Sequence, residues 1–223
     1  MEILLKGVEA FHEHYYQSRR EMFETLAESQ HPVALFVTCS DSRIDPNLLT
    51  QTKPGELFVL RNAGNIIPPY GASGGGECAT VEYAVNALNI RDIIVCGHTN
   101  CGAMKALRQR ELTEGLPAVA EWLAYAETAL IEEGAAETHG DEASQLESLI
   151  EKNVLAQLAN LRTHPAVAAH LAAGGLRLHG WVYRIRHGVV AVHDPTQSRF
   201  VTAQSAPDKG DIARQELKAA ATK

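Results

Sequence analysis

Three short apolar runs constrain the fold of this chain more than any other feature of its sequence. They are VALFVT (33–38), GELFVLR (55–61) and RDIIVCG (91–97), and each has the length of a buried strand. The β-branched content of the third run favours parallel pairing. Segments with helical periodicity lie between and around these runs. Strands that alternate with helices predict an α/β fold with a mainly parallel central β-sheet flanked by helices.

The helices are predicted from the spacing of apolar residues. Apolar side chains recur at helical intervals over 7–30 and 77–88, and again from Leu146 onward. We expect the last of these helices to end at His164 and Pro165, because the residue before a proline avoids helical backbone angles. A shorter helix is expected to start near Cys101.

The domain organisation is predicted to be simple, because the chain shows no internal repeat and no linker. We expect a single domain over 1–203, whose residues 1–30 form a helical arm, followed by a weakly ordered tail over 204–223. The Ala- and Glu-rich middle of the chain is predicted to be helical with a break at 134–141. Residues 176–194 predict two strands that turn at His187 and Gly188.

Charge and hydropathy argue against several classes of function. A net charge of −7 and a pI near 5.8 argue against nucleic acids and anionic membrane surfaces as partners, since both need a basic face. No apolar run approaches the roughly 20 residues that span a bilayer. Glu2, Lys6 and Glu9 interrupt any signal segment at the start of the sequence. We therefore expect a cytoplasmic protein whose four cysteines are free or bound to metal.

Metal-ligating residues follow two of the predicted strands. Cys39 and His98 both lie just past strand ends, where α/β sheets form their functional crevices. Cys101 follows His98 by three residues at a strand-to-helix turn. Two thiolates and one imidazole suit zinc, and three protein ligands leave one position for water.

The spacing of these residues is a weak signal by itself, and inert roles are open to all of them. The two cysteines and the histidine could be packing residues, as we expect of Cys78 and Cys96. Asp41 and Arg43 could form a surface ion pair that contributes little to stability. Inert roles do not explain why these side chains cluster at strand ends, beside glycines.

Four segments together resemble the β-class carbonic anhydrases. In order, they are CSDSR (39–43), PGELFVLRNAGN (54–65), GGGECATVEYAV (74–85) and GHTNCGAMKAL (97–107). The resemblance extends from the helical arm to HGWVY (179–183). Gln30, NIIPPYG and GAMKAL are similar to the plant-type branch of the family, including bacterial members associated with cyanate metabolism.

This resemblance implies a zinc enzyme that reversibly hydrates carbon dioxide to bicarbonate and a proton. Cys39, His98 and Cys101 would hold one Zn²⁺ per subunit, and a zinc-bound hydroxide would attack CO₂. Asp41 would accept a hydrogen bond from the zinc-bound water and so orient it. Arg43 would hold the Asp41 carboxylate away from the metal through a charge-assisted hydrogen bond.

The resemblance also implies a narrow substrate pocket and an oligomer. Some pocket residues are supplied across a subunit interface in this family, and the helical arm packs on a neighbouring subunit. A homodimer is therefore the minimum, and a higher homo-oligomer is compatible. The residues that match pocket positions are Gln30, Phe58, Ala63, Tyr83 and Gly102. Core packing is the alternative role for Phe58 and Tyr83.

Two other functions remain open from the sequence. One is a hydrolase of carbonyl sulfide or carbon disulfide on the same site, and the other is a non-catalytic, zinc-stabilised oligomer. Asp41 and Arg43 argue against the second, since a purely structural site needs no restrained carboxylate. A bicarbonate-inhibited branch of the family carries Trp where this chain has Phe36. We therefore expect no bicarbonate-driven switch, although Arg61 of that branch's site is present.

Overall fold

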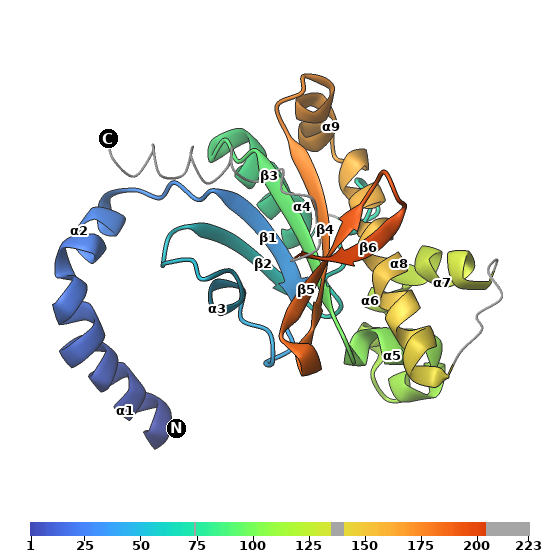
Figure 1. The fold of residues 1–223 in the computed structure, drawn as a ribbon, viewed down its shortest axis with the longest axis horizontal. Coiled ribbons are helices and arrows are strands. Elements are labelled where there is room, and N and C mark those ends of the chain that lie inside the picture. Colours follow the sequence, from blue (N-terminus) through green and yellow to red (C-terminus); the bar gives the residue numbers. More distant parts are fainter. Residues whose placement is uncertain (74, 135–140, 204–223) are drawn as a thin grey trace.

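The fold is built on a six-stranded sheet. A computed structural model describes residues 1–73, 75–134 and 141–203 (Figure 1). Within these residues the strand order is β2-β1-β3-β4-β5-β6. Strands β2, β1, β3 and β4 pair parallel with one another, and β5 pairs antiparallel with both β4 and β6. Their bounds are β1 Ala34–Cys39, β2 Leu57–Asn62, β3 Asp92–His98, β4 Arg177–Arg184, β5 Val189–Asp194 and β6 Arg199–Thr202. This confirms the predicted mainly parallel sheet.

The end of the sheet contains one predicted and one unpredicted feature. The turn between β4 and β5 occurs at Ile185–His187 and Gly188, as expected, and Gly188 has a positive φ of 63°. The short edge strand β6 was not predicted from the sequence. It pairs with β5 after a turn in which the Asp194 carboxylate accepts hydrogen bonds from the Thr196 backbone and hydroxyl.

Helices cover the sheet and extend from it. The α-helices are α1 Glu2–Ala10, α2 Arg20–Glu28, α3 Pro46–Thr50, α4 Gly76–Glu82, α5 Gly102–Arg108, α6 Pro117–Leu123, α7 Glu127–Gly134, α8 Glu142–Thr163 and α9 Pro165–Ala172. Shorter π and 3-10 turns connect some of them, at Phe11–Tyr16, Gln17–Arg19, Tyr83–Ala87, Arg110–Thr113 and Ala124–Ala126. The expected tail over 204–223 and most of the break expected at 134–141 lie outside the described residues.

The longest helix, α8, begins and ends where its sequence dictates. The Asp141 side chain caps it by accepting a hydrogen bond from the Ser144 N–H at 2.9 Å. The helix stops before His164 and Pro165, as predicted. Pro165 also starts α9, which was not predicted, because a proline suits the first position of a helix as well as it ends one.

Helix α8 packs against the sheet at two glycines. Gly97 in β3 and Gly180 in β4 face Val154, and a Cβ atom at either glycine would come within 3.0 Å of a Val154 methyl carbon. The absence of side chains at these two positions therefore lets the helix approach the strands. The middle of α8 therefore packs against the C-terminal end of β3.

The core is divided unequally between the two faces of the sheet. Alternate residues of β1 point to opposite faces. Leu35 and Val37 join a large apolar cluster with residues of α4, α5, α8 and α9. Phe36 belongs to a smaller cluster with Ile44 and Cys96, against which Leu49 of α3 packs. The carboxyl ends of β1 and β3, which are paired neighbours, meet at one edge of this core.

The N-terminal arm projects away from the sheet (Figure 1). It consists of α1, α2 and the turns between them, and no residue of these elements is buried. Its exposed apolar side chains include Ile3, Leu4, Leu5, Val8 and Phe11, which are 45–80% exposed. Packing of this arm on a neighbouring subunit stays a prediction. Among the described residues, no helix has the length and hydropathy required to cross a bilayer.

Candidate metal centre

The three expected ligands converge at the edge where β1 and β3 end. Cys39 is the last residue of β1, His98 is the last residue of β3, and Cys101 precedes the first residue of α5. All three are buried, and their ligand atoms lie within 4.8 Å of one another. The two Sγ atoms are 4.0 Å apart. Two thiolates on a tetrahedral zinc, with Zn–S bonds of about 2.3 Å, would be separated by about 3.8 Å.

The hydrogen bonds of His98 leave one nitrogen available to a metal. Its Nδ1 lies 3.1 Å from the Thr99 carbonyl oxygen, which can only accept, so Nδ1 carries the proton. Nε2 is buried and has no hydrogen-bond partner among the described residues. Because an unpaired buried nitrogen is unfavourable, its lone pair beside two thiols fits a metal ligand.

The two thiols lie close enough for each to affect the ionisation of the other. The hydrogen bond from Cys101, with a smaller contribution from the Gly64 N–H, lowers the pKa of Cys39 below its ordinary value, against the effect of burial. The same thiol contact and burial raise the pKa of Cys101. A divalent cation would allow both to ionise, as zinc coordination requires.

Asp41 and Arg43 form a two-point ion pair beside this cluster. Arg43 Nε donates to Asp41 Oδ1 at 2.9 Å, and its Nη2 donates to Oδ2 at 2.7 Å. This side-chain contact holds the pKa of Asp41 well below its usual range. Asp41 Oδ2 lies 3.8 Å from His98 Nε2. An ionised carboxylate thus lies next to the expected metal position, with both of its oxygens engaged by Arg43.

Arg61 fixes the loop that carries these residues. From β2, its guanidinium donates to the carbonyl oxygens of Cys39, Asp41 and Ile44, at 2.8–3.1 Å. The sequence connected Arg61 only with a bicarbonate site of another branch, and its role in holding the loop was missed. The parallel pairing of β1 and β2, which aligns Thr38 with Arg61, is the feature that places it there.

The expected pocket residues occupy varied surroundings. The rings of Phe58 and Tyr83 lie 6.0 Å apart, and Tyr83 is half exposed. Ala63 precedes Gly64, whose N–H lies 3.4 Å from Cys39 Sγ, and Gly102 follows Cys101 at the start of α5. Gln30 is exposed, between α2 and β1. Their roles in binding substrate stay predictions.

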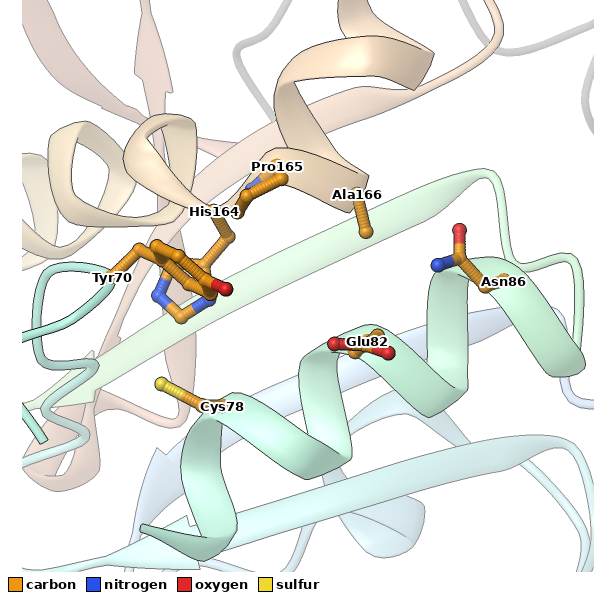
Figure 2. Close-up of a pocket in the computed structure, with 7 residues that line it drawn as sticks. All are labelled: Tyr70, Cys78, Glu82, Asn86, His164, Pro165 and Ala166. Atoms are coloured by element: carbon orange, nitrogen blue, oxygen red, sulfur yellow. The ribbon is translucent and has the colours of Figure 1, made fainter. Parts of the chain in front are cut away.

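A separate cavity of about 220 Å³ lies between α4 and the start of α9 (Figure 2). Its lining includes Cys78, Glu82 and His164 but none of the three expected metal ligands. Burial raises the pKa of the Cys78 thiol, and in β3 it raises that of Cys96 to about 12. Neither cysteine belongs to the metal cluster found among the described residues.

Comparisons with known proteins agree with this geometry. Residues 34–190 match the family model described as carbonic anhydrase. A carbonic anhydrase of Pseudomonas aeruginosa is 50% identical, over 93% of this chain and 94% of the relative. One of Synechocystis sp. is 49% identical, over 92% of this chain and 75% of the relative. The solved structure of the β-carbonic anhydrase CcaA superposes with a TM-score of 0.88 at 49% identity, covering 91% of this chain and 98% of that one. The chain belongs to the β-carbonic anhydrase family.

Proposed function

We propose that this member of the family is a zinc-dependent enzyme that interconverts carbon dioxide with bicarbonate and a proton. The observation that carries the proposal is the unpaired Nε2 of His98, buried beside the thiols of Cys39 and Cys101. A restrained carboxylate, that of Asp41, lies 3.8 Å from the same nitrogen. A purely structural zinc site would not need such a carboxylate.

Each residue of the centre takes a distinct role in this proposal. Zinc, when bound by Cys39, His98 and Cys101, supplies the acidification that lets water attack carbon dioxide near neutral pH. Asp41 accepts a hydrogen bond from the attacking water and so orients it. Arg43 keeps Asp41 ionised and prevents its carboxylate from joining the ligand set.

The substrate pocket and the oligomer belong to the same proposal. Gln30, Phe58, Ala63, Tyr83 and Gly102 line the pocket, some of them from a second subunit. The exposed apolar side chains of the N-terminal arm support at least a homodimer. A β-carbonic anhydrase of Sordaria macrospora, 28% identical with a TM-score of 0.73, is described as tetrameric. The four free cysteines support a cytoplasmic location.

Stopped-flow measurement of CO₂ hydration tests the proposal. The purified protein should contain about one zinc per chain, accelerate hydration, and lose both zinc and activity after treatment with a strong chelator. Restoring zinc should restore the rate. Parallel assays with carbonyl sulfide and carbon disulfide distinguish a hydrolase. A zinc-loaded, folded oligomer that fails to accelerate CO₂ hydration would refute the proposal.

A further inference from the structure

One peptide group connects the Cys39 sulfur to an aromatic side chain outside the ligand set. The N–H of Gly64 donates to Cys39 Sγ at 3.4 Å. The carbonyl oxygen of the same peptide group, contributed by Ala63, accepts a hydrogen bond from Trp122 Nε1 at 2.8 Å. Hydrogen bonds at both ends of one peptide polarise it in the same direction. The Trp122 contact therefore both orients and strengthens the donor that reaches the sulfur.

The backbone at this point is suited to glycine alone. Gly64 has a φ of 82°, which residues with a Cβ rarely adopt. A Cβ there would also lie 3.1 Å from the side chains of Ala103 and Met104, at the start of α5. The segment NAGN (62–65) thus turns sharply against the helix that follows Cys101, and the turn directs the Gly64 N–H toward Cys39.

A second hydrogen bond fixes the peptide group on the C-terminal side of Gly64. The buried side chain of Asn153, in α8, donates to the Gly64 carbonyl oxygen at 3.0 Å. Gln157 donates in turn to Asn153 Oδ1 at 2.9 Å and accepts from the Ile67 N–H at 2.9 Å. Each of these buried amides is therefore fixed in orientation, since a buried polar group is stable only when it is hydrogen-bonded.

We propose that Trp122 and Asn153 are positioning residues of the metal centre, because together they hold the Gly64 N–H against the Cys39 sulfur. The inference rests on the proposed function, since it concerns a thiolate that binds zinc. A hydrogen bond to a metal-bound thiolate fixes the sulfur and withdraws part of its charge, and such outer contacts tune metal affinity. Neither residue was recognised from the sequence.

The sharpest test removes the Trp122 donor while keeping an aromatic ring. Trp122→Phe replaces the indole with a phenyl ring and so removes the Nε1–H that reaches Ala63, and Tyr125→Phe is its matched control. Tyr125 stacks edge-on against Trp122 at 5.8 Å and donates its hydroxyl to the Ala72 carbonyl oxygen at 3.2 Å. Zinc release from the holoenzyme to a chromophoric chelator should accelerate roughly 10-fold in Trp122→Phe, the low end of the range for outer contacts. It should be unchanged in Tyr125→Phe.

A second pair of variants tests Asn153. Asn153→Asp replaces the amide donor with an acceptor of the same shape, so the contact with Gly64 is lost. Asn47→Asp is its control, because the Asn47 amide of α3 also donates to a backbone carbonyl oxygen, that of Lys53, at 3.3 Å, and lies outside the Asn153–Gln157 network. Zinc release should accelerate roughly 10- to 100-fold in Asn153→Asp and remain near the wild-type rate in Asn47→Asp.

Absorption of the cobalt-substituted proteins separates positioning of the sulfur from general destabilisation. A lost hydrogen bond raises the energy of the sulfur lone pair, so the sulfur-to-cobalt charge-transfer band should move to longer wavelength in Trp122→Phe and Asn153→Asp only. Equal release rates in the variants and their controls, with unshifted bands, would overturn the inference and leave the zinc enzyme standing. A wild-type protein that binds no zinc would refute both. If Asn153→Asp fails to fold, the Trp122→Phe result decides.

Discussion

Arg43 grips the Asp41 carboxylate by both oxygens, with its Nε on Oδ1 at 2.9 Å and its Nη2 on Oδ2 at 2.7 Å. Arg43 also donates to the Asn100 carbonyl oxygen at 3.1 Å, between His98 and Cys101 in the sequence. The ion pair therefore links the loop after β1, which follows Cys39, to the loop after β3, which connects His98 with Cys101. This geometry makes the charge of Asp41, rather than its bulk, the property to test first.

Asp41→Asn should keep zinc and lose most of the turnover. The amide has the same shape but cannot remain an anionic acceptor for the attacking water, so we expect kcat to fall roughly 10²-fold or more. Stopped-flow CO₂ hydration and zinc analysis measure the two properties separately. Asp45→Asn is the control, because Asp45 caps α3 and asparagine caps helices equally well. Full activity in Asp41→Asn would exclude the orienting role.

Cys39→Ala should lose the metal itself. Removing one of three protein ligands leaves too few donors for tight binding, so zinc content should drop well below one per chain. Cys78→Ala provides the comparison, since Cys78 is half-buried beside the α4–α9 cavity and outside the metal cluster. Elemental analysis after gel filtration measures the ratio. Stoichiometric zinc in Cys39→Ala would contradict the ligand assignment.

Arg61→Met should destabilise the loop between β1 and α3. The substitution keeps much of the apolar stem but leaves the carbonyl oxygens of Cys39, Asp41 and Ile44 without their charged donor. We expect the free energy of unfolding to fall by about 2 kcal/mol or more. Chemical denaturation measures this change, with Arg199→Met as the control because Arg199 is likewise exposed but donates to a side chain, that of Gln197, and not to the Cys39–Ile44 loop. Equal effects of the two substitutions would argue against this role.

Asp92 should contribute a pH-dependent part of the stability. Although burial opposes ionisation, hydrogen bonds from His179 and Arg177, each at 2.7 Å, hold the pKa of Asp92 below its ordinary value of 3.8. A depressed folded-state pKa stabilises the fold above pH 3.8, and that contribution is lost as the pH falls. The stability difference between wild type and Asp92→Asn should thus shrink as the pH falls from 5 to 3, by up to about 1.4 kcal/mol per pH unit.

Denaturant titrations of the two proteins at pH 5 and pH 3, at equal protein concentration, measure this difference, because at both pH values a histidine such as His179 is mainly protonated. Taking the difference between the two proteins removes titrations that they share. A difference that stays constant down to pH 3 would show that Asp92 has an ordinary pKa in the folded chain.

Deleting residues 1–28 should reduce the oligomer. The deletion removes α1 and α2, whose apolar side chains the single chain leaves exposed, and with them the surface that we expect to cover a neighbouring subunit. Light scattering coupled to gel filtration should show a smaller particle than the full-length chain forms. The same mass per particle before and after deletion would place the subunit interface elsewhere.

The parallel strands, and two members of the cluster that could hold a metal, could be predicted because their signals are local. Buried strands are apolar throughout, and His98 and Cys101 are three residues apart. The edge strand β6 was missed because Arg199–Thr202 is short and follows a polar turn. Trp122 and Asn153 were missed for a different reason. They meet the Ala63–Gly64 segment across 59 and 89 residues of sequence, and only the tertiary structure brings these partners together.

The close approach of α8 to Gly97 and Gly180 has a consequence for protein engineering. Asn153 directly precedes Val154, the residue that faces both glycines. The packing of the helix on the strands therefore also sets the position of the Asn153 amide. A designer who transplants the cysteines and the histidine onto another parallel sheet would obtain the ligands without this support. A faithful graft must also carry two strand positions free of side chains and a helix that lies directly upon them.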